Sequence, residues 1–142
     1  MTTRALPLNR LVELREREVD RLTADFAARE AMRQRYVGNI ERMQALCRES
    51  GASGSVSPAL AANFAGYKES LIQLAESHRT DLAAHEAQMV VAQQALHQAA
   101  RGHEVLRQVV EKQAHALQRA EGVREQKRVD DLASQVWLRG RS

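Results

Sequence analysis

The chain has 142 residues, enough for one ordinary domain, but its composition argues against a globular fold that contains a sheet. Aromatic residues make up only 4% of it, while Ala, Leu, Glu, Gln and Arg dominate, as they do in long helices and coiled coils. Lys and Arg number 21 against 18 Asp and Glu. This close mixture of signs does not favour a nucleic-acid-binding protein.

The first predicted helix covers about residues 5–49 and begins around Pro7. Apolar side chains alternate along it at spacings of four and three, which is the pattern of a coiled-coil seam. The predicted seam contains three arginines and runs through Leu8, Val12, Arg15, Val19, Leu22, Phe26, Arg29, Arg33, Tyr36, Ile40, Met43, Cys47 and Ser50.

A turn is predicted at about residues 50–57, where Gly51 and Gly54 stand among serines. The next helix starts at a recognisable signal. Ser57 can cap its first turn with the side-chain hydroxyl, and Pro58 suits the first helical position because its missing N–H needs no partner there.

The second predicted helix covers about residues 58–138 and carries a longer stripe that lapses after Ala120. Its expected seam is Leu60, Phe64, Tyr67, Leu71, Leu74, His78, Leu82, His85, Met89, Ala92, Leu96, Ala99, His103, Leu106, Val110, Gln113, Leu117 and Ala120. The whole chain therefore reads as a single all-α domain, an antiparallel two-helix coiled-coil hairpin with a longer C-terminal helix.

A short turn fixes which residues of the two helices should face each other. The expected layers pair Met43 with Tyr67, Ile40 with Leu71, Phe26 with His85 and Val19 with Ala92. The same register places Arg29 opposite Asp81, which would neutralise it, and Arg33 opposite His78, which would not.

Helices of these lengths would measure about 68 Å and about 120 Å, so roughly the last thirty residues should lack a partner within the chain. That segment contains Val123, Val129, Leu132, Val136 and Trp137. Binding to another protein, self-association or fraying could account for these apolar side chains, and we favour a partner protein.

A second apolar surface is expected in the opening third of the long helix. Phe64, Tyr67, Leu71, Ile72 and Leu74 form a patch wider than a two-helix seam can cover. Part of this patch should stay exposed, which is typical of a docking face.

Other kinds of site have weaker support. The sequence contains no phosphate loop, nucleophile elbow or Cys pair, so it predicts neither an enzyme nor a cofactor. His78 and His85, with Asp81 between them, lie seven residues apart rather than the three or four of paired helical metal ligands. Cys47 is expected to be a small seam residue rather than a redox thiol.

The location of the protein can also be anticipated. Cys47 has no partner for an internal disulfide, and the first residues lack the apolar core of a signal peptide. The charge-free stretch from Ser50 to Tyr67 is broken by Gly, Ser and Pro, so it does not resemble a membrane span. We expect a reduced, cytoplasmic protein.

Two stretches resemble the FliJ family of the bacterial flagellar type III export apparatus. One carries Asn63, Tyr67, Leu71 and His78 after the Gly/Ser turn, and the other is "EQKRVDDLA", residues 125–133. Length and helix–turn–helix plan agree with the family. The first helix departs from it, because family members often have several aromatic residues near the turn.

The resemblance implies a non-enzymatic rod similar to the central stalk of rotary ATPases. Its implied partners are the hexameric flagellar export ATPase, the cytoplasmic domain of the export gate protein and export chaperones. It implies no nucleic acid and no membrane insertion, and a location peripheral to the inner-membrane export apparatus.

The resemblance also implies where the partners bind. The gate surface would be Tyr67, Leu71, Leu74 and His78, accompanied by Arg33, Val37, Ile40 and Gln44. The ATPase surface would be the unpaired C-terminal segment, with Val123, Arg124, Gln126, Lys127, Val129, Asp130, Leu132, Val136 and Trp137.

Three alternatives remain open. The chain could be the equivalent stalk of a virulence type III injectisome. It could be a homo-oligomeric structural coiled coil in which the C-terminal segments pair with each other. A basic nucleic-acid binder is the third, since the terminal regions are the more basic parts of the chain.

Overall fold

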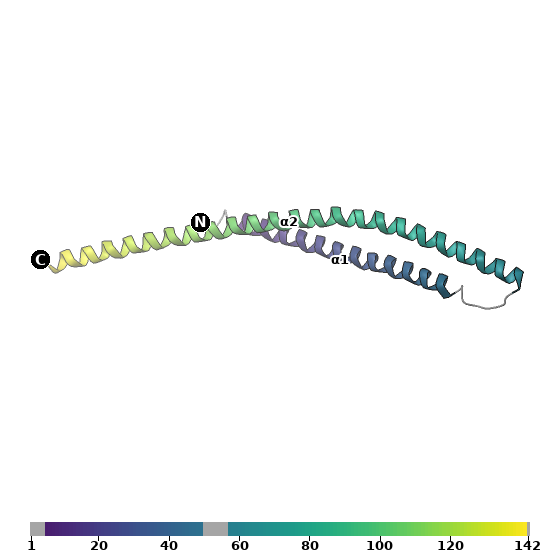
Figure 1. Cartoon of the computed structure of the whole chain (residues 1–142). Coiled ribbons are helices and arrows are strands. Elements are labelled where there is room, and N and C mark those ends of the chain that lie inside the picture. The colour runs from purple at the N-terminus through teal and green to yellow at the C-terminus, as the bar shows by residue number, and fades with distance from the viewer. Residues whose placement is uncertain (1–4, 50–56, 142) are drawn as a thin grey trace. The chain divides into compact units, whose positions relative to one another are not determined.

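The computed structural model describes residues 5–49 and 57–141 and contains only helix and turn there (Figure 1). Helix α1 spans Ala5–Glu49 and helix α2 spans Pro58–Gly140. The all-α class and the packing of two long helices are as the sequence predicts. The predicted cap of α2 is confirmed, because the backbone N of Leu60 donates to Ser57 Oγ at 3.3 Å and Ala61 N donates to Ser57 O at 2.9 Å.

Two compact units can be distinguished along the chain. One comprises residues 18–98, and the other comprises residues 1–17 together with 99–142. Both helices contribute residues to both units. That the units together form a single domain stays a prediction.

In the unit of residues 18–98 the helices pack antiparallel, but the register differs from the predicted one. Arg29 Nη1 donates to Gln88 Oε1 at 3.3 Å, so Arg29 faces a residue seven positions beyond the expected Asp81. His85 Nε2 donates to the backbone O of Arg29 at 2.8 Å. The expected layers, Met43 with Tyr67 among them, are wrong by about one heptad, because shifting by seven residues leaves a heptad pattern unchanged.

The seam of α1 follows the predicted positions closely. All of those that the structure describes are buried or half-buried except Arg15, which is exposed, while Ser50 lies outside the described residues. The buried seam residues of α2 are Leu71, Ala75, His85 and Met89, with His78 and Leu82 half-buried. Leu60, Phe64, Tyr67 and Leu74 were expected in this seam and are exposed instead.

The new register explains this exposure. Because each residue of α1 faces a residue further along α2 than expected, the first turns of α2 have no described residue of α1 to pack against. Every residue from Ser57 to Ser70 is exposed. We call the exposed apolar side chains near this end of α2 the shoulder: Leu60, Phe64, Tyr67, Ile72 and Leu74.

The other unit shows the predicted uncovered end of α2. Ala99, His103, Leu106 and Val110 are half-buried, but every residue from 111 to 141 is exposed. We call residues 111–141 the overhang. Its exposure confirms that the C-terminal part of the long helix lacks cover within the described chain.

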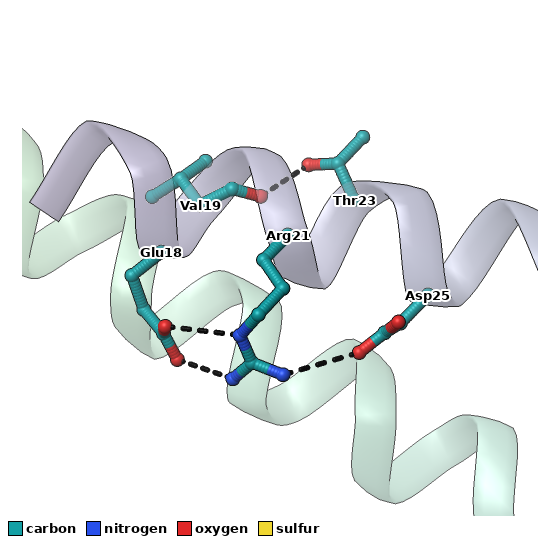
Figure 2. A network of polar contacts seen from close by, with 5 residues as sticks. All are labelled: Glu18, Val19, Arg21, Thr23 and Asp25. Carbon is teal, nitrogen blue, oxygen red and sulfur yellow. Dashed lines mark hydrogen bonds and ion pairs between the residues drawn. The ribbon is translucent and has the colours of Figure 1, made fainter.

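Ion pairs along single helices support these exposed surfaces. In α1 the Arg21 guanidinium lies between two carboxylates, with Nη2 2.7 Å from Glu18 Oε1 and Nη1 3.3 Å from Asp25 Oδ2 (Figure 2). Thr23 Oγ1 donates to the backbone O of Val19 on the same stretch. Spacings of three and four residues bring such groups together on a helix surface and favour the helix modestly.

Candidate functional site

The shoulder offers an apolar surface that α1 does not cover. Tyr67 and Leu74 are each 48% exposed, and Phe64 and Ile72 are exposed as well. The expectation that part of this patch stays exposed is therefore confirmed, although Leu71 is buried at 9%. Burial of such side chains by a partner would be favourable at about 25 cal/mol per Å² of apolar surface.

The residues that the resemblance assigns to the gate surface do not share one exposed face. Tyr67 and Leu74 are exposed, whereas Leu71 and Ile40 are buried in the seam. The others, Arg33, Val37, Gln44 and His78, are half-buried. A partner that docks without parting the helices can therefore reach Tyr67 and Leu74 fully, and Leu71 and Ile40 act mainly by holding the helices together.

His78 and His85 flank one aromatic ring of α1. The ring of Tyr36 lies 6.2 Å from that of His78 and 5.8 Å from that of His85, measured between centroids, with both pairs tilted. His78 Nδ1 is buried without a hydrogen-bond partner in the structure. Over the described residues, no group of three His, Cys, Asp or Glu side chains is placed to hold a metal ion.

The second seam arginine finds its partner within its own helix. Arg33 Nη2 lies 2.7 Å from Glu30 Oε1, so Arg33 does not depend on the residue opposite it for charge neutralisation. The hydrogen bond from Arg33, followed by one from Gln34, lowers the pKa of Glu30 from its ordinary value of 4.5 to about 2. The same hydrogen bond to Glu30 raises the pKa of Arg33.

This lowered pKa makes a testable contribution to stability. A carboxylate with a folded-state pKa below the unfolded one stabilises the fold above the unfolded pKa, and the contribution is lost as pH falls from about 4.5 to about 2. Glu30→Gln should therefore lower the melting temperature at pH 7 and match the original chain near pH 2. Glu41→Gln, at an exposed position on the same helix, is the control for thermal melts at both pH values. Equal effects of the two substitutions at pH 7 would contradict the assignment.

The overhang carries the residues that the resemblance assigns to the ATPase. All nine are exposed: Val123, Arg124, Gln126, Lys127, Val129, Asp130, Leu132, Val136 and Trp137. Because Leu132 and Val136 are four residues apart and Val129 precedes Leu132 by three, these three share one face of the helix. Trp137 is 59% exposed, and the guanidinium of Arg141 lies 4.4 Å from the centroid of its ring.

Polar side chains along the overhang are partly paired with one another. Arg128 Nη2 lies 2.8 Å from Glu125 Oε1, and Gln126 Nε2 donates to Asp130 Oδ1 at 3.1 Å. These contacts join residues three or four apart on one helix, so they support helical structure where α1 gives no cover. The charged motif in residues 125–133 thus holds itself together and leaves its apolar neighbours exposed.

Some features of the site escaped the sequence pattern. Ala75 is the most buried residue of the core at 4%, but a seam drawn through large apolar residues passes it over in favour of Leu74. Cys47 is half-buried and lines a shallow groove between the helices with Ile72 and Arg79. The spacing of Leu71, Ala75, His78 and Leu82 would have identified the seam had alanine been counted as a core residue.

Comparison with known proteins gives one match. A family model described as Flagellar FliJ protein matches residues 4–142. No curated protein and no solved structure matches the chain. Within the described residues, neither helix contains a stretch that is long and apolar enough to cross a membrane.

Proposed function

The chain belongs to the flagellar FliJ protein family, which makes it a component of flagellar type III export, and from this premise we propose that it is a non-enzymatic stalk of the export apparatus. It binds the hexameric export ATPase through the overhang, promotes assembly of the ring and raises its turnover. Through the shoulder it binds the cytoplasmic domain of the export gate protein. It also receives empty export chaperones and works in the cytoplasm, peripheral to the inner membrane.

One observation supports this proposal above the others. The long helix has exposed apolar surface in two separate places, the shoulder on residues 60–74 and the overhang on residues 111–141, and no residue belongs to both. Contiguous exposed apolar surface marks interaction sites on proteins. Two such surfaces on one chain suit a protein that couples two partners, and neither requires any chemistry of the chain itself.

The first test is binding and turnover with the cognate export ATPase. The purified chain should co-elute with the ATPase and raise its rate of ATP hydrolysis. A chain that neither binds nor stimulates the ATPase would refute the stalk function. Light scattering on the chain alone tests the homo-oligomeric alternative, in which the overhangs pair in a tight dimer at micromolar concentration. Stimulation by the flagellar ATPase but not by an injectisome ATPase would separate the two export systems.

A second prediction concerns the shoulder. Tyr67→Ala combined with Leu74→Ala should weaken binding to the gate domain by about tenfold or more, since truncating a central aromatic and an aliphatic anchor often costs more than 1.4 kcal/mol. Both side chains are half-exposed, so the melting temperature should change little. Titration of the gate domain by calorimetry measures the affinity.

The control for the shoulder is a pair of substitutions away from it. Val90→Ala with Val91→Ala removes two other exposed apolar side chains from the same helix and should leave the affinity for the gate unchanged. If the shoulder variant binds the gate as tightly as the original chain, this surface is not the gate site.

A further inference from the structure

A row of three basic side chains lies along one side of α2, at Arg101, Lys112 and Arg119. Arg101 and Arg119 are eighteen residues apart, which is five turns of an α-helix, so they lie on one line about 27 Å apart. Lys112 falls within about 20° of the same line. We call these three residues the basic row.

The basic row faces away from α1. Residues of α2 that are half-buried in this unit include Ala99 and Val110. Arg101 and Arg119 each lie nine residues from Val110, about two and a half turns, and therefore on the opposite side of the helix. All three basic side chains are exposed, and no part of α1 is needed to explain their position.

No carboxylate neutralises the basic row within the part of the chain that the structure describes. The neighbouring acids are engaged elsewhere, because Glu104 Oε1 lies 2.9 Å from Arg107 Nη2 and Glu111 Oε1 lies 3.3 Å from Arg107 Nη1. The residues between the row's members on its own side are neutral amides or imidazole, at Gln108 and His115. The row therefore presents unpaired positive charge over several turns.

We propose that the basic row binds a carboxylate-lined protein surface, and that this surface belongs to the export ATPase. The inference rests on the proposed function, because it gives the ATPase a second contact on the same unit as the overhang. The apolar side chains of the overhang supply short-range burial, while the row accelerates encounter and sets the rotational position of the helix.

The spacing of the charges favours protein carboxylates over nucleic acid. Duplex DNA presents one negative charge per about 1.7 Å of its axis, and tight non-specific binding uses many phosphate contacts. Three cations spread over about 27 Å would neutralise few of them. Single strands need aromatic side chains for base stacking, and the nearest aromatic residue of α2 after the row is Trp137.

The test uses the full chain with Arg101→Gln, Lys112→Gln and Arg119→Gln. Its association rate constant and affinity for the purified ATPase should each fall about tenfold at roughly 50 mM salt, if each exposed charge contributes a factor of about two. The deficit should shrink at high salt, because screening weakens the same interactions in the original chain.

The matched control changes the same number of charges in the same unit. Arg10→Gln, Arg15→Gln and Arg17→Gln alter exposed arginines of α1 for which the structure shows no ion pair among the described residues. This variant should bind the ATPase as the original chain does. Equal losses in the two triple variants, or undiminished binding by the row variant, would overturn the basic row as a contact surface.

Two further outcomes separate this inference from its premise. If the original chain fails to bind the ATPase, the proposed function itself falls and the row loses its assigned partner. If a mixed-sequence DNA duplex binds the original chain at about 150 mM salt and binding disappears in the row variant, nucleic acid replaces the ATPase as the occupant.

Discussion

Removing residues 123–142 is expected to return the export ATPase to the rate it shows without the chain, while binding to the gate domain stays intact. Every described residue of this segment is exposed, so its loss removes no core packing. It does remove Leu132, Val136 and Trp137, the apolar groups proposed to be buried against the ATPase. Loss of a central tryptophan alone commonly costs about 2 kcal/mol or more, about 30-fold in affinity.

Point substitutions refine the same test without shortening the chain. Leu132→Glu with Val136→Glu places two charges on the apolar face of the overhang and should abolish stimulation. Ser134→Glu with Leu138→Glu adds the same charges to the opposite side of the same turns and should largely preserve it. Steady-state ATP hydrolysis measures both. Full stimulation by the truncated chain would show that the overhang is not the ATPase site.

The largest expected effect on stability comes from Leu71→Ala. Leu71 is 9% exposed in a core of only a few buried residues, so the cavity should cost about 2–3 kcal/mol of unfolding free energy. Leu74→Ala, three residues away and 48% exposed, should cost less than about 0.5 kcal/mol. Urea unfolding followed by circular dichroism compares the two.

This pair also tests the register of the helices. A seam through Leu71 and Ala75 makes Leu74 dispensable, whereas the seam expected from the sequence buries Leu74. Similar losses for the two alanine variants would contradict the packing described for residues 18–98. Leu46→Ala provides a reference on α1, because its side chain is likewise exposed.

Helices and caps were predictable because local signals determine them. Ser57 and Pro58 mark the start of α2, and the alternation of apolar residues locates the seam of α1. The uncovered overhang followed from the unequal lengths of the two helices, 45 and 83 residues. Each of these conclusions depends on neighbouring residues or on counting.

The register was not predictable in the same way. Sliding one helix by seven residues restores the same apolar face, so the pattern fits both registers equally well. The choice depended on an assumed pairing across the turn, and the contact between Arg29 and Gln88 shows that this assumption was wrong. The binding assignments inherited the error, since it placed Tyr67 against α1 rather than in the exposed shoulder.

Charge was visible in the sequence, but its compensation was not. Arg107 and Arg119 look alike in a residue count, yet Arg107 pairs with Glu104 and Glu111 while Arg119 forms no ion pair in the described structure. Pairing depends on which rotamers neighbouring side chains adopt together. The basic row becomes apparent only after the paired arginines have been set aside.

The central claim is that one chain couples two partners through separate surfaces, and its most direct test is a three-component binding experiment. The original chain, the export ATPase and the gate domain are mixed and analysed by size-exclusion chromatography with light scattering. Because the shoulder and the overhang share no residue, all three proteins should co-elute in one complex. Mutually exclusive binding, in which the gate domain displaces the ATPase from the chain, would contradict the account.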